Sequence, residues 1–197
     1  MRRLPAPLST ILCAVVLSTG CSAPPEKEIS RAQSSIEAAR TAGADQYAPE
    51  SFAAATTAFQ QAREAVDQRD YRLALTRAVD ATERAGDAGR EAVDGKARAR
   101  RAAETAVNAV NAGLRSLDAG IRTAETARLT PRDLAEARAV ARNAAVALQK
   151  ARALLSAENY KDARTAVSGL DDQIRAQIAA VTEATNARAA RKPARAR

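Results

Sequence analysis

The chain has 197 residues, a formal net charge of +8, no His, no Trp, two Cys and one Met. This length suits one domain or two small ones. Runs of alternating β-branched and aromatic residues, the signature of strands, are nearly absent, so the composition argues against a sheet protein. The lack of His removes the commonest general base and zinc ligand. Alanine is the commonest residue and the best helix former, so the chain is predicted to be all-α.

The first 20 residues have the layout of an export signal. Arg2 and Arg3 form a short positive region, and Leu8 to Leu17 is apolar. The apolar run ends near Gly20, and its roughly 13 residues would span about 20 Å as a helix. That is too short for a hydrocarbon core of about 30 Å. Residues 1–20 are therefore predicted to be a cleaved signal peptide.

The segment from Val16 to Ser22, VLSTGCS, resembles a bacterial lipobox. Gly20 is the small residue before Cys21, and cleavage between the two would leave Cys21 as the lipid-bearing first residue. Ser18 departs from the motif, in which Leu is usual at that position. Several acyl chains, at about 0.8 kcal/mol per buried CH₂, would hold the protein on a membrane. The alternative is an ordinary signal peptide with a chance cysteine.

The residues around Cys21 also bear on location. Ser22 is not Asp, and by resemblance to the enterobacterial sorting rule this implies the periplasmic face of the outer membrane, with the inner membrane as the alternative. Both cysteines, Cys13 and Cys21, lie in the first 21 residues, so the mature chain can form no internal disulfide. Residues 21–27, with two prolines, are predicted to be a short stiff linker.

The first half of the mature chain is predicted to form three helices. The first covers residues 26–42, and the stretch GADQYAP that begins at Gly43 breaks it. The second starts at Pro49, because proline suits the first helical position, and ends near residue 69. A third follows Asp70 with a stripe of alanines. Three glycines in it predict a fray, bend or short break. They are Gly86, Gly89 and Gly95.

The second half carries larger apolar residues at heptad spacing. A seam steps by three and four residues from Val107 to Ala124. Thr130 is then the predicted N-cap of a helix over residues 131–158, with Asp133 completing a capping box. A last helix is expected from residue 160 to about 187. The remaining ten residues, 188–197, are predicted to be a disordered basic tail.

Two segments resemble each other, one starting at Tyr47 and the other at Leu129. Each has Pro at a helix start, a long Ala-rich helix, an Asp-Tyr or Asn-Tyr turn, and a second Ala-rich helix. The repeat-like halves cover about 47–90 and 129–182. The second helix of the first half is similar to that of a TPR repeat, although the Trp and Leu-Gly signature is missing.

This pattern resembles domain of unknown function 4398, an alanine-rich family of bacterial lipoproteins, and the match is best over residues 28–90. The resemblance implies a helical fold and an envelope location. The family has no established activity. Its members often lie beside peptidoglycan-binding domains, but this chain contains none, so attachment to the cell wall does not follow from the family.

The sequence predicts an elongated antiparallel bundle of long helices over residues 28–187, with TPR-like hairpins. The sequence does not predict an enzyme, and it predicts no metal site and no cofactor. The adjacent acids Asp171 and Asp172 would diverge by about 100° on a helix, so they cannot converge on one ligand. The expected function is a lipid-anchored structural or adaptor module with an envelope protein partner or self-association.

The alternative function is a bridge whose tail contacts peptidoglycan or anionic lipid through its basic residues. These are Arg188, Arg191, Lys192, Arg195 and Arg197. A solvated tail without a ligand is the other reading of this cluster, while the export signal argues against nucleic acid as a partner.

Overall fold

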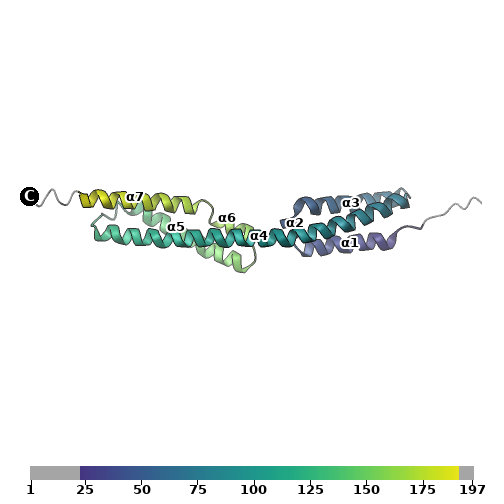
Figure 1. Ribbon diagram of the computed structural model, residues 1–197, viewed down its shortest axis with the longest axis horizontal. Coiled ribbons are helices and arrows are strands. Elements are labelled where there is room, and N and C mark those ends of the chain that lie inside the picture. Colours follow the sequence, from purple (N-terminus) through teal and green to yellow (C-terminus); the bar gives the residue numbers. More distant parts are fainter. Residues whose placement is uncertain (1–22, 191–197) are drawn as a thin grey trace, which may run out of the picture.

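The computed structural model describes residues 23–190, and across this range all elements are α-helices. They form a thin rod made of two helical bundles placed end to end (Figure 1). The bounds are α1 Glu26–Thr41, α2 Ala44–Tyr47, α3 Pro49–Asp67, α4 Tyr71–Thr126, α5 Ala135–Ser156, α6 Tyr160–Ala166 and α7 Leu170–Ala190. The predicted all-α bundle of long helices is confirmed.

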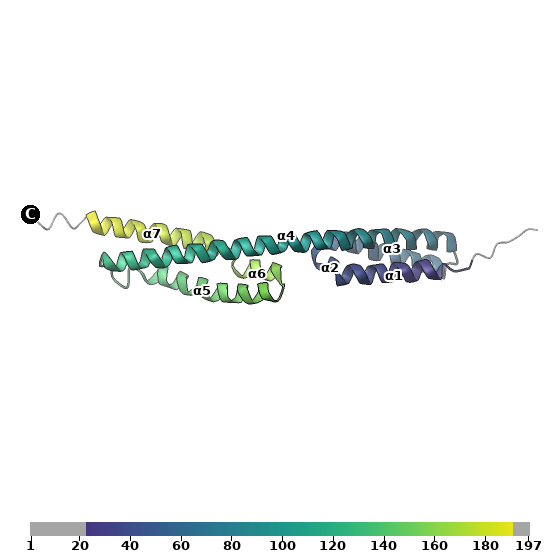
Figure 2. The same cartoon turned by 60° about the horizontal axis from the view of Figure 1, so that its bottom comes forward.

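Helix α4 is the backbone of the rod and belongs to both bundles. Its first half packs against α1, α2 and α3, which we call the N-terminal bundle. Its second half packs against α5, α6 and α7, the C-terminal bundle. Consecutive long helices run antiparallel in both bundles (Figures 1 and 2). With 56 residues at about 1.5 Å each, α4 is about 84 Å long.

The predicted break at Gly86, Gly89 and Gly95 is wrong, because α4 runs through all three. Two of these glycines lie where another segment approaches the helix closely. A Cβ on Gly89 would lie 3.8 Å from the Cα of Ala39 in α1, and one on Gly95 would lie 2.6 Å from the backbone oxygen of Tyr47. A glycine costs a helix about 1 kcal/mol relative to alanine. Packing on both halves of α4 offsets that cost.

The core of the N-terminal bundle consists almost entirely of alanine. Ile36 is its one large buried aliphatic residue, while Phe52 and Phe59 pack at its edges and are partly exposed. The predicted small-residue stripe on α4 is buried. It comprises Ala74, Ala78, Ala81 and Ala85. Because alanine removes little apolar area from water, this core contributes less per residue than one of leucine and valine.

The C-terminal bundle has a core of larger residues. The heptad seam of α4 meets the leucines of α5 and the β-branched residues of α7. Its fully enclosed members are Val110, Leu117, Leu134 and Ile174. The predicted apolar face of each of these helices is thus buried. Hydrophobic stabilisation is concentrated in this half of the rod.

Three helix ends share one turn geometry. Arg69, Arg128 and Glu158 have φ values of 59°, 66° and 58°, and each follows a long helix. In the turns after α3 and α5, the amides of Asp70 and Asn159 donate to the carbonyls five residues earlier, at 2.8 and 2.9 Å. This is the Schellman arrangement. The tyrosine after each turn starts the next helix, so the two repeats have equivalent turns.

The second repeat departs from its predicted boundaries in three places. Helix α5 begins at Ala135, and residues 131–134 form a turn in place of its predicted first helical turn. The single helix expected after residue 160 is divided into α6 and α7, because Gly169 takes φ +74° between them. Helix α7 extends to Ala190, so Arg188 lies on a helix rather than in a disordered tail.

The two termini of the described chain lie at opposite ends of the rod. The chain enters α1 at the end where α3 turns into α4, and it leaves α7 at the far end of the other bundle (Figure 2). This follows because each bundle contains three long helices that run antiparallel in turn. Helix α4 is the last of the three in the N-terminal bundle and the first of the three in the C-terminal bundle. Any group attached before α1 is therefore held a rod's length from any group attached after α7.

Candidate functional site

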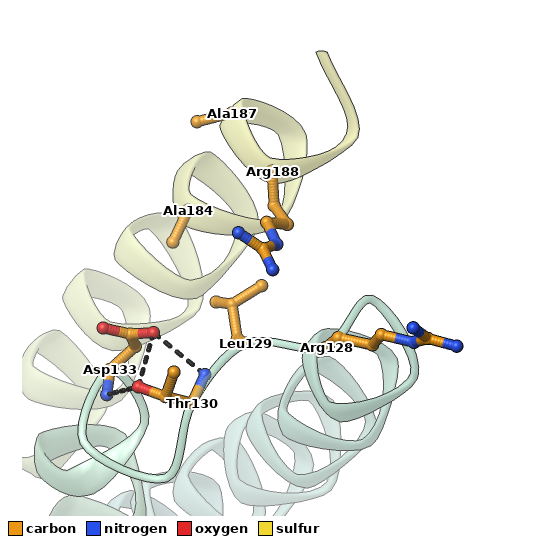
Figure 3. A pocket seen from close by; sticks show the side chains of 7 residues that line it. All are labelled: Arg128, Leu129, Thr130, Asp133, Ala184, Ala187 and Arg188. Carbon is orange, nitrogen blue, oxygen red and sulfur yellow. Dashed lines mark hydrogen bonds between the residues drawn. The ribbon is translucent and has the colours of Figure 1, made fainter. Parts of the chain in front are cut away.

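A cleft of about 430 Å³ opens at the C-terminal end of the rod, between the α4–α5 loop and the last turns of α7 (Figure 3). Leu129, Ala184 and Ala187 supply its apolar walls. Arg188 reaches from α7 over Leu129, whereas Arg128 points away from the cleft (Figure 3). The two guanidinium groups thus do not converge on one ligand position.

Thr130 and Asp133 close the α4–α5 loop beside this cleft. The carboxylate of Asp133 accepts hydrogen bonds from the hydroxyl and the amide of Thr130, at 2.8 and 2.9 Å, and the Asp133 amide donates back to the hydroxyl at 3.3 Å. These bonds, aided by the charge of Arg188, hold the pKa of Asp133 below its usual value. The predicted capping pair is formed, although the helix itself starts two residues after Asp133.

The charges of the predicted polyanion site divide between the end of the rod and the tail. Arg188 is exposed on α7, whereas Arg191, Lys192, Arg195 and Arg197 lie outside the described residues, as do Gly20 and Cys21. Six of the 31 Lys and Arg residues fall in 1–22 and 191–197, where there is no acidic residue. Residues 23–190 therefore carry 25 basic and 23 acidic residues, a net charge of +2, and residues 191–197 add +4.

A second polar cluster lies where the two bundles meet, in the middle of the rod. Lys96 of α4 pairs with Glu158 of the α5–α6 turn, with 2.6 Å between Nζ and Oε2. Lys161 of α6 lies 5.4 Å from the ring centre of Tyr47 and donates a hydrogen bond to the backbone oxygen of Gln46. Side chains from both bundles thus contact one another, and we call this cluster the junction.

The junction perturbs the ionisation of its members. A hydrogen bond and charge attraction to Lys96 lower the pKa of Glu158, and the same contact raises the pKa of Lys96. Burial raises the pKa of the Tyr47 hydroxyl. We assign these shifts to the contact between the bundles rather than to catalysis, because both charged groups are exposed and already paired.

The Lys96–Glu158 contact should depend on pH in a defined direction. Since the pKa of Glu158 is lowered by folding, the contact's contribution is present above the unfolded value and is lost as pH falls through the folded one. Lys96 sets the opposite limit: its contribution is lost as pH rises through its raised pKa. We expect a carboxyl NMR titration to place Glu158 below ordinary glutamate, and Lys96→Gln to return it toward that value. A titration curve that Lys96→Gln leaves unchanged would contradict the assignment.

Neither cluster contains a set of side chains that could hold a metal ion. Among residues 23–190 there is no group of three His, Cys, Asp or Glu side chains placed to hold a metal ion. Asp171 of the Asp171–Asp172 pair is engaged by Arg175 one turn later. Membrane-spanning helices are also not found within this range: none of α1–α7 combines the length and the hydropathy that a span requires.

The junction could not be predicted from the sequence. Lys96 and Glu158 are 62 residues apart, and Lys161 is 115 residues from Gln46. The stretch that begins at Gly43 ends the first helix as predicted, but its middle forms the short helix α2, Ala44–Tyr47, which brings Tyr47 against α4. No local pattern signals such contacts, because they depend on how two bundles are aligned along one helix.

Known proteins provide no further guide to these surfaces. No family model matches the chain, and neither the curated proteins nor the solved structures contain a match to it.

Proposed function

We propose that the protein is a lipid-anchored envelope lipoprotein that acts as a rigid spacer. Lipid on Cys21 would hold one end at the membrane, at the periplasmic face of the outer membrane, and the rod would carry its basic C-terminal end away from it. The resemblance of residues 28–90 to an alanine-rich lipoprotein family agrees with this location.

The observation that carries the proposal is the position of the two ends. The start of α1, five residues after Cys21, and the end of α7, one residue before Arg191, lie at opposite ends of the rod (Figure 1). A bundle with an even number of passes would return the basic segment to the membrane. Here the end of α7 would stand on the order of 80 Å from the anchor, given the length of α4 and about 1.5 Å of rise per residue.

The rod also has the stiffness that a spacer needs. Helix α4 crosses from one bundle to the other without interruption, so the bundles share a continuous set of backbone hydrogen bonds. The Lys96–Glu158 pair and the Lys161–Gln46 hydrogen bond add contacts across the same point. Bending there would break these contacts and strain the helix.

The charge distribution favours a polyanion at the far end. Residues 23–190 are nearly balanced at +2, whereas residues 191–197 add four positive charges and no negative one. Each basic group near an anionic surface contributes about 1 kcal/mol. Because Arg128 and Arg188 do not converge, a polymer or surface with many separated anionic groups suits this end better than a single small anion. Peptidoglycan and anionic lipid both have this chemistry.

The lipid anchor is tested by metabolic palmitate labelling in the native envelope. The parent protein should incorporate label and Cys21→Ser should not, because that thiol is the only one left after cleavage. Equal labelling of both chains would contradict the anchor. Recovery of chains that still begin at Met1 from the soluble cell interior would contradict export as well.

The basic end is tested by binding to isolated peptidoglycan sacculi. A variant with Arg191, Lys192, Arg195 and Arg197 changed to Gln should lose most of its binding, and the parent's binding should weaken as salt rises. A matched control changes four exposed arginines of the N-terminal bundle to Gln and removes the same charge. They are Arg31, Arg63, Arg72 and Arg98. Equal losses in the two variants would show that only net charge matters and would remove the far end as the contact.

An adaptor role is the second candidate, and a groove beside α1 favours it. Glu28, Arg31, Val79, Thr82 and Glu83 line a groove of about 180 Å³ between α1 and α4, with Val79 44% exposed. A helix of another envelope protein could pack there. Proximity labelling in the native envelope should then identify one protein whose labelling Val79→Glu abolishes. The four tail changes should leave that labelling intact.

A further inference from the structure

The turn between α3 and α4, with the first residues of α4, forms the end of the rod from which α1 starts (Figure 2). We call residues 67–76 the hairpin tip. Two large apolar side chains are exposed on it: Leu73 is 39% and Leu75 is 41% exposed. We propose that the hairpin tip rests on the lipid bilayer, with Leu73 and Leu75 inserted at its surface. This inference rests on the proposed lipid anchor at Cys21.

The tip extends beyond the beginning of α1. Glu28 and Arg31 of α1 line the same groove as Val79, Thr82 and Glu83 of α4, so these segments lie at one level of the rod. Helix α1 begins two residues before Glu28 and runs in the same direction as α4 (Figure 2). Residues 71–76 of α4 therefore lie past the start of α1, on the side from which the chain arrives.

The length of the linker places this tip near the membrane. Cys21 is five residues before Glu26, and five fully extended residues span at most about 18 Å. Lipid on Cys21 would thus hold the start of α1 within that distance of the bilayer. The hairpin tip protrudes in the same direction, so it is the first part of the rod to meet the lipid surface.

The two leucines are not required by the fold. In the second repeat, the residues two and four positions after the equivalent tyrosine, Tyr160, are Asp162 and Arg164, and both are exposed. The turn geometry before them is the same. The same helix start is therefore built with charged residues after Tyr160, in the middle of the rod, and with leucines after Tyr71, at the end from which α1 starts. The leucines occur only in the repeat next to the anchor.

The positions of the leucines around α4 indicate how the rod meets the bilayer. Residues two apart on a helix point about 200° apart, so Leu73 and Leu75 lie on opposite sides of α4. A rod lying flat could bury only one of them, whereas a rod standing on its tip brings both to the lipid. An upright rod is also what a spacer requires.

Charge contributes less than apolar burial to the proposed contact between the hairpin tip and the bilayer. The tip carries two acidic residues, Asp67 and Asp70, and two basic ones, Arg69 and Arg72, for a net charge of zero. The Asp70 side chain accepts a hydrogen bond from the amide of Leu73 as the cap of α4. The contact should therefore form on a zwitterionic bilayer as well as on an anionic one, because burial of the leucines drives it.

The test uses the absence of tryptophan from the chain. Single-tryptophan forms of the full lipidated protein are placed in phosphatidylcholine vesicles whose acyl chains carry bromine, a quencher of tryptophan emission. The substitutions Leu73→Trp and Leu75→Trp report on the tip. Val93→Trp reports on the side of the same bundle and Val146→Trp on the other bundle, at positions 61% and 68% exposed.

We expect quenching of both tip variants to exceed that of the two controls several-fold, at low and high protein density alike. Equal quenching of all four, with the protein floating with the vesicles, would overturn this inference and leave the anchor intact. Quenching of position 93 as strong as that of position 75 would show a rod lying flat. Protection of the tip tryptophans that appears only at high protein density would show a second copy on the tip. Either result would overturn the proposed contact with the bilayer. Protein that does not float with the vesicles would overturn the anchor itself.

Discussion

Leu117→Ala is expected to lower the free energy of unfolding by about 2–5 kcal/mol, the range for truncating an enclosed leucine. Leu117 is 0% exposed and lies in the core where α4 meets α5 and α7. Its removal leaves a cavity that rigid neighbouring helices can fill only in part. Urea unfolding followed by circular dichroism measures the loss, and amide hydrogen exchange locates it. We expect faster exchange in α5, α7 and the second half of α4.

The matched control is Val146→Ala, on α5 of the same bundle. Val146 is 68% exposed, so its truncation should change the free energy of unfolding by no more than about 0.5 kcal/mol. The N-terminal bundle should exchange faster than the C-terminal bundle even in the parent, because its core is built from alanine. Equal stability losses in the two variants would contradict the packing described for the C-terminal bundle.

Gly95→Ala should destabilise the protein, although alanine is the better helix former. The added methyl would lie 2.6 Å from the backbone oxygen of Tyr47, closer than real contacts allow. The neighbour is backbone, so α2 must move away from α4. Overpacking of this kind costs about 1–3 kcal/mol. The gain of about 1 kcal/mol in helix propensity offsets part of it. Thermal unfolding measures the net change.

Gly86→Ala is the control for this prediction. Gly86 lies in the same helix, and the nearest atom to an added methyl is the flexible end of Arg90, at 3.6 Å. That variant should be more stable than the parent by about 0.5–1 kcal/mol, since only the propensity gain remains. If Gly95→Ala were stabilised to the same extent, the contact between Tyr47 and α4 would not constrain the fold.

Both predictions concern the same property of the rod. The C-terminal bundle is held by enclosed leucines and β-branched residues, whereas the N-terminal bundle is held by close approach of small ones. The backbone of Tyr47 lies so close to α4 that a methyl group at Gly95 does not fit. In the C-terminal bundle, a cavity in place of the Leu117 side chain would lower the stability. A spacer needs both halves intact, because either one failing would release an end of α4.

Much of this fold can be predicted from the residues alone. The heptad seam from Val107 to Ala124 gives a helix and its buried face, and the Pro49 and Tyr71 signals give helix starts to the residue. The similarity between the turns at Tyr71 and Tyr160 was also visible in the sequence, and the two turns have the same hydrogen bonds. These features can be predicted because each one is local and depends on residues within one or two helical turns.

Other features could not be predicted, because they depend on contacts between distant segments. The glycines of α4 predict a break, because glycine has a low helix propensity. The helices that pack on α4 keep it continuous. The distal cleft beside Arg188 exists only because the α4–α5 loop and the end of α7 lie together. The tyrosine, lysines and glutamate of the junction likewise come from four separate elements.

The sequence by itself determined that the chain is helical, where α3 and α4 start, and which faces of the long helices are apolar, because these follow from propensity and from a spacing of three to four residues. Only the tertiary structure decided that one helix serves both bundles and that the ends of the chain point in opposite directions. That arrangement depends on where long helices pack along α4, which is fixed by burial between distant segments and not by any local pattern.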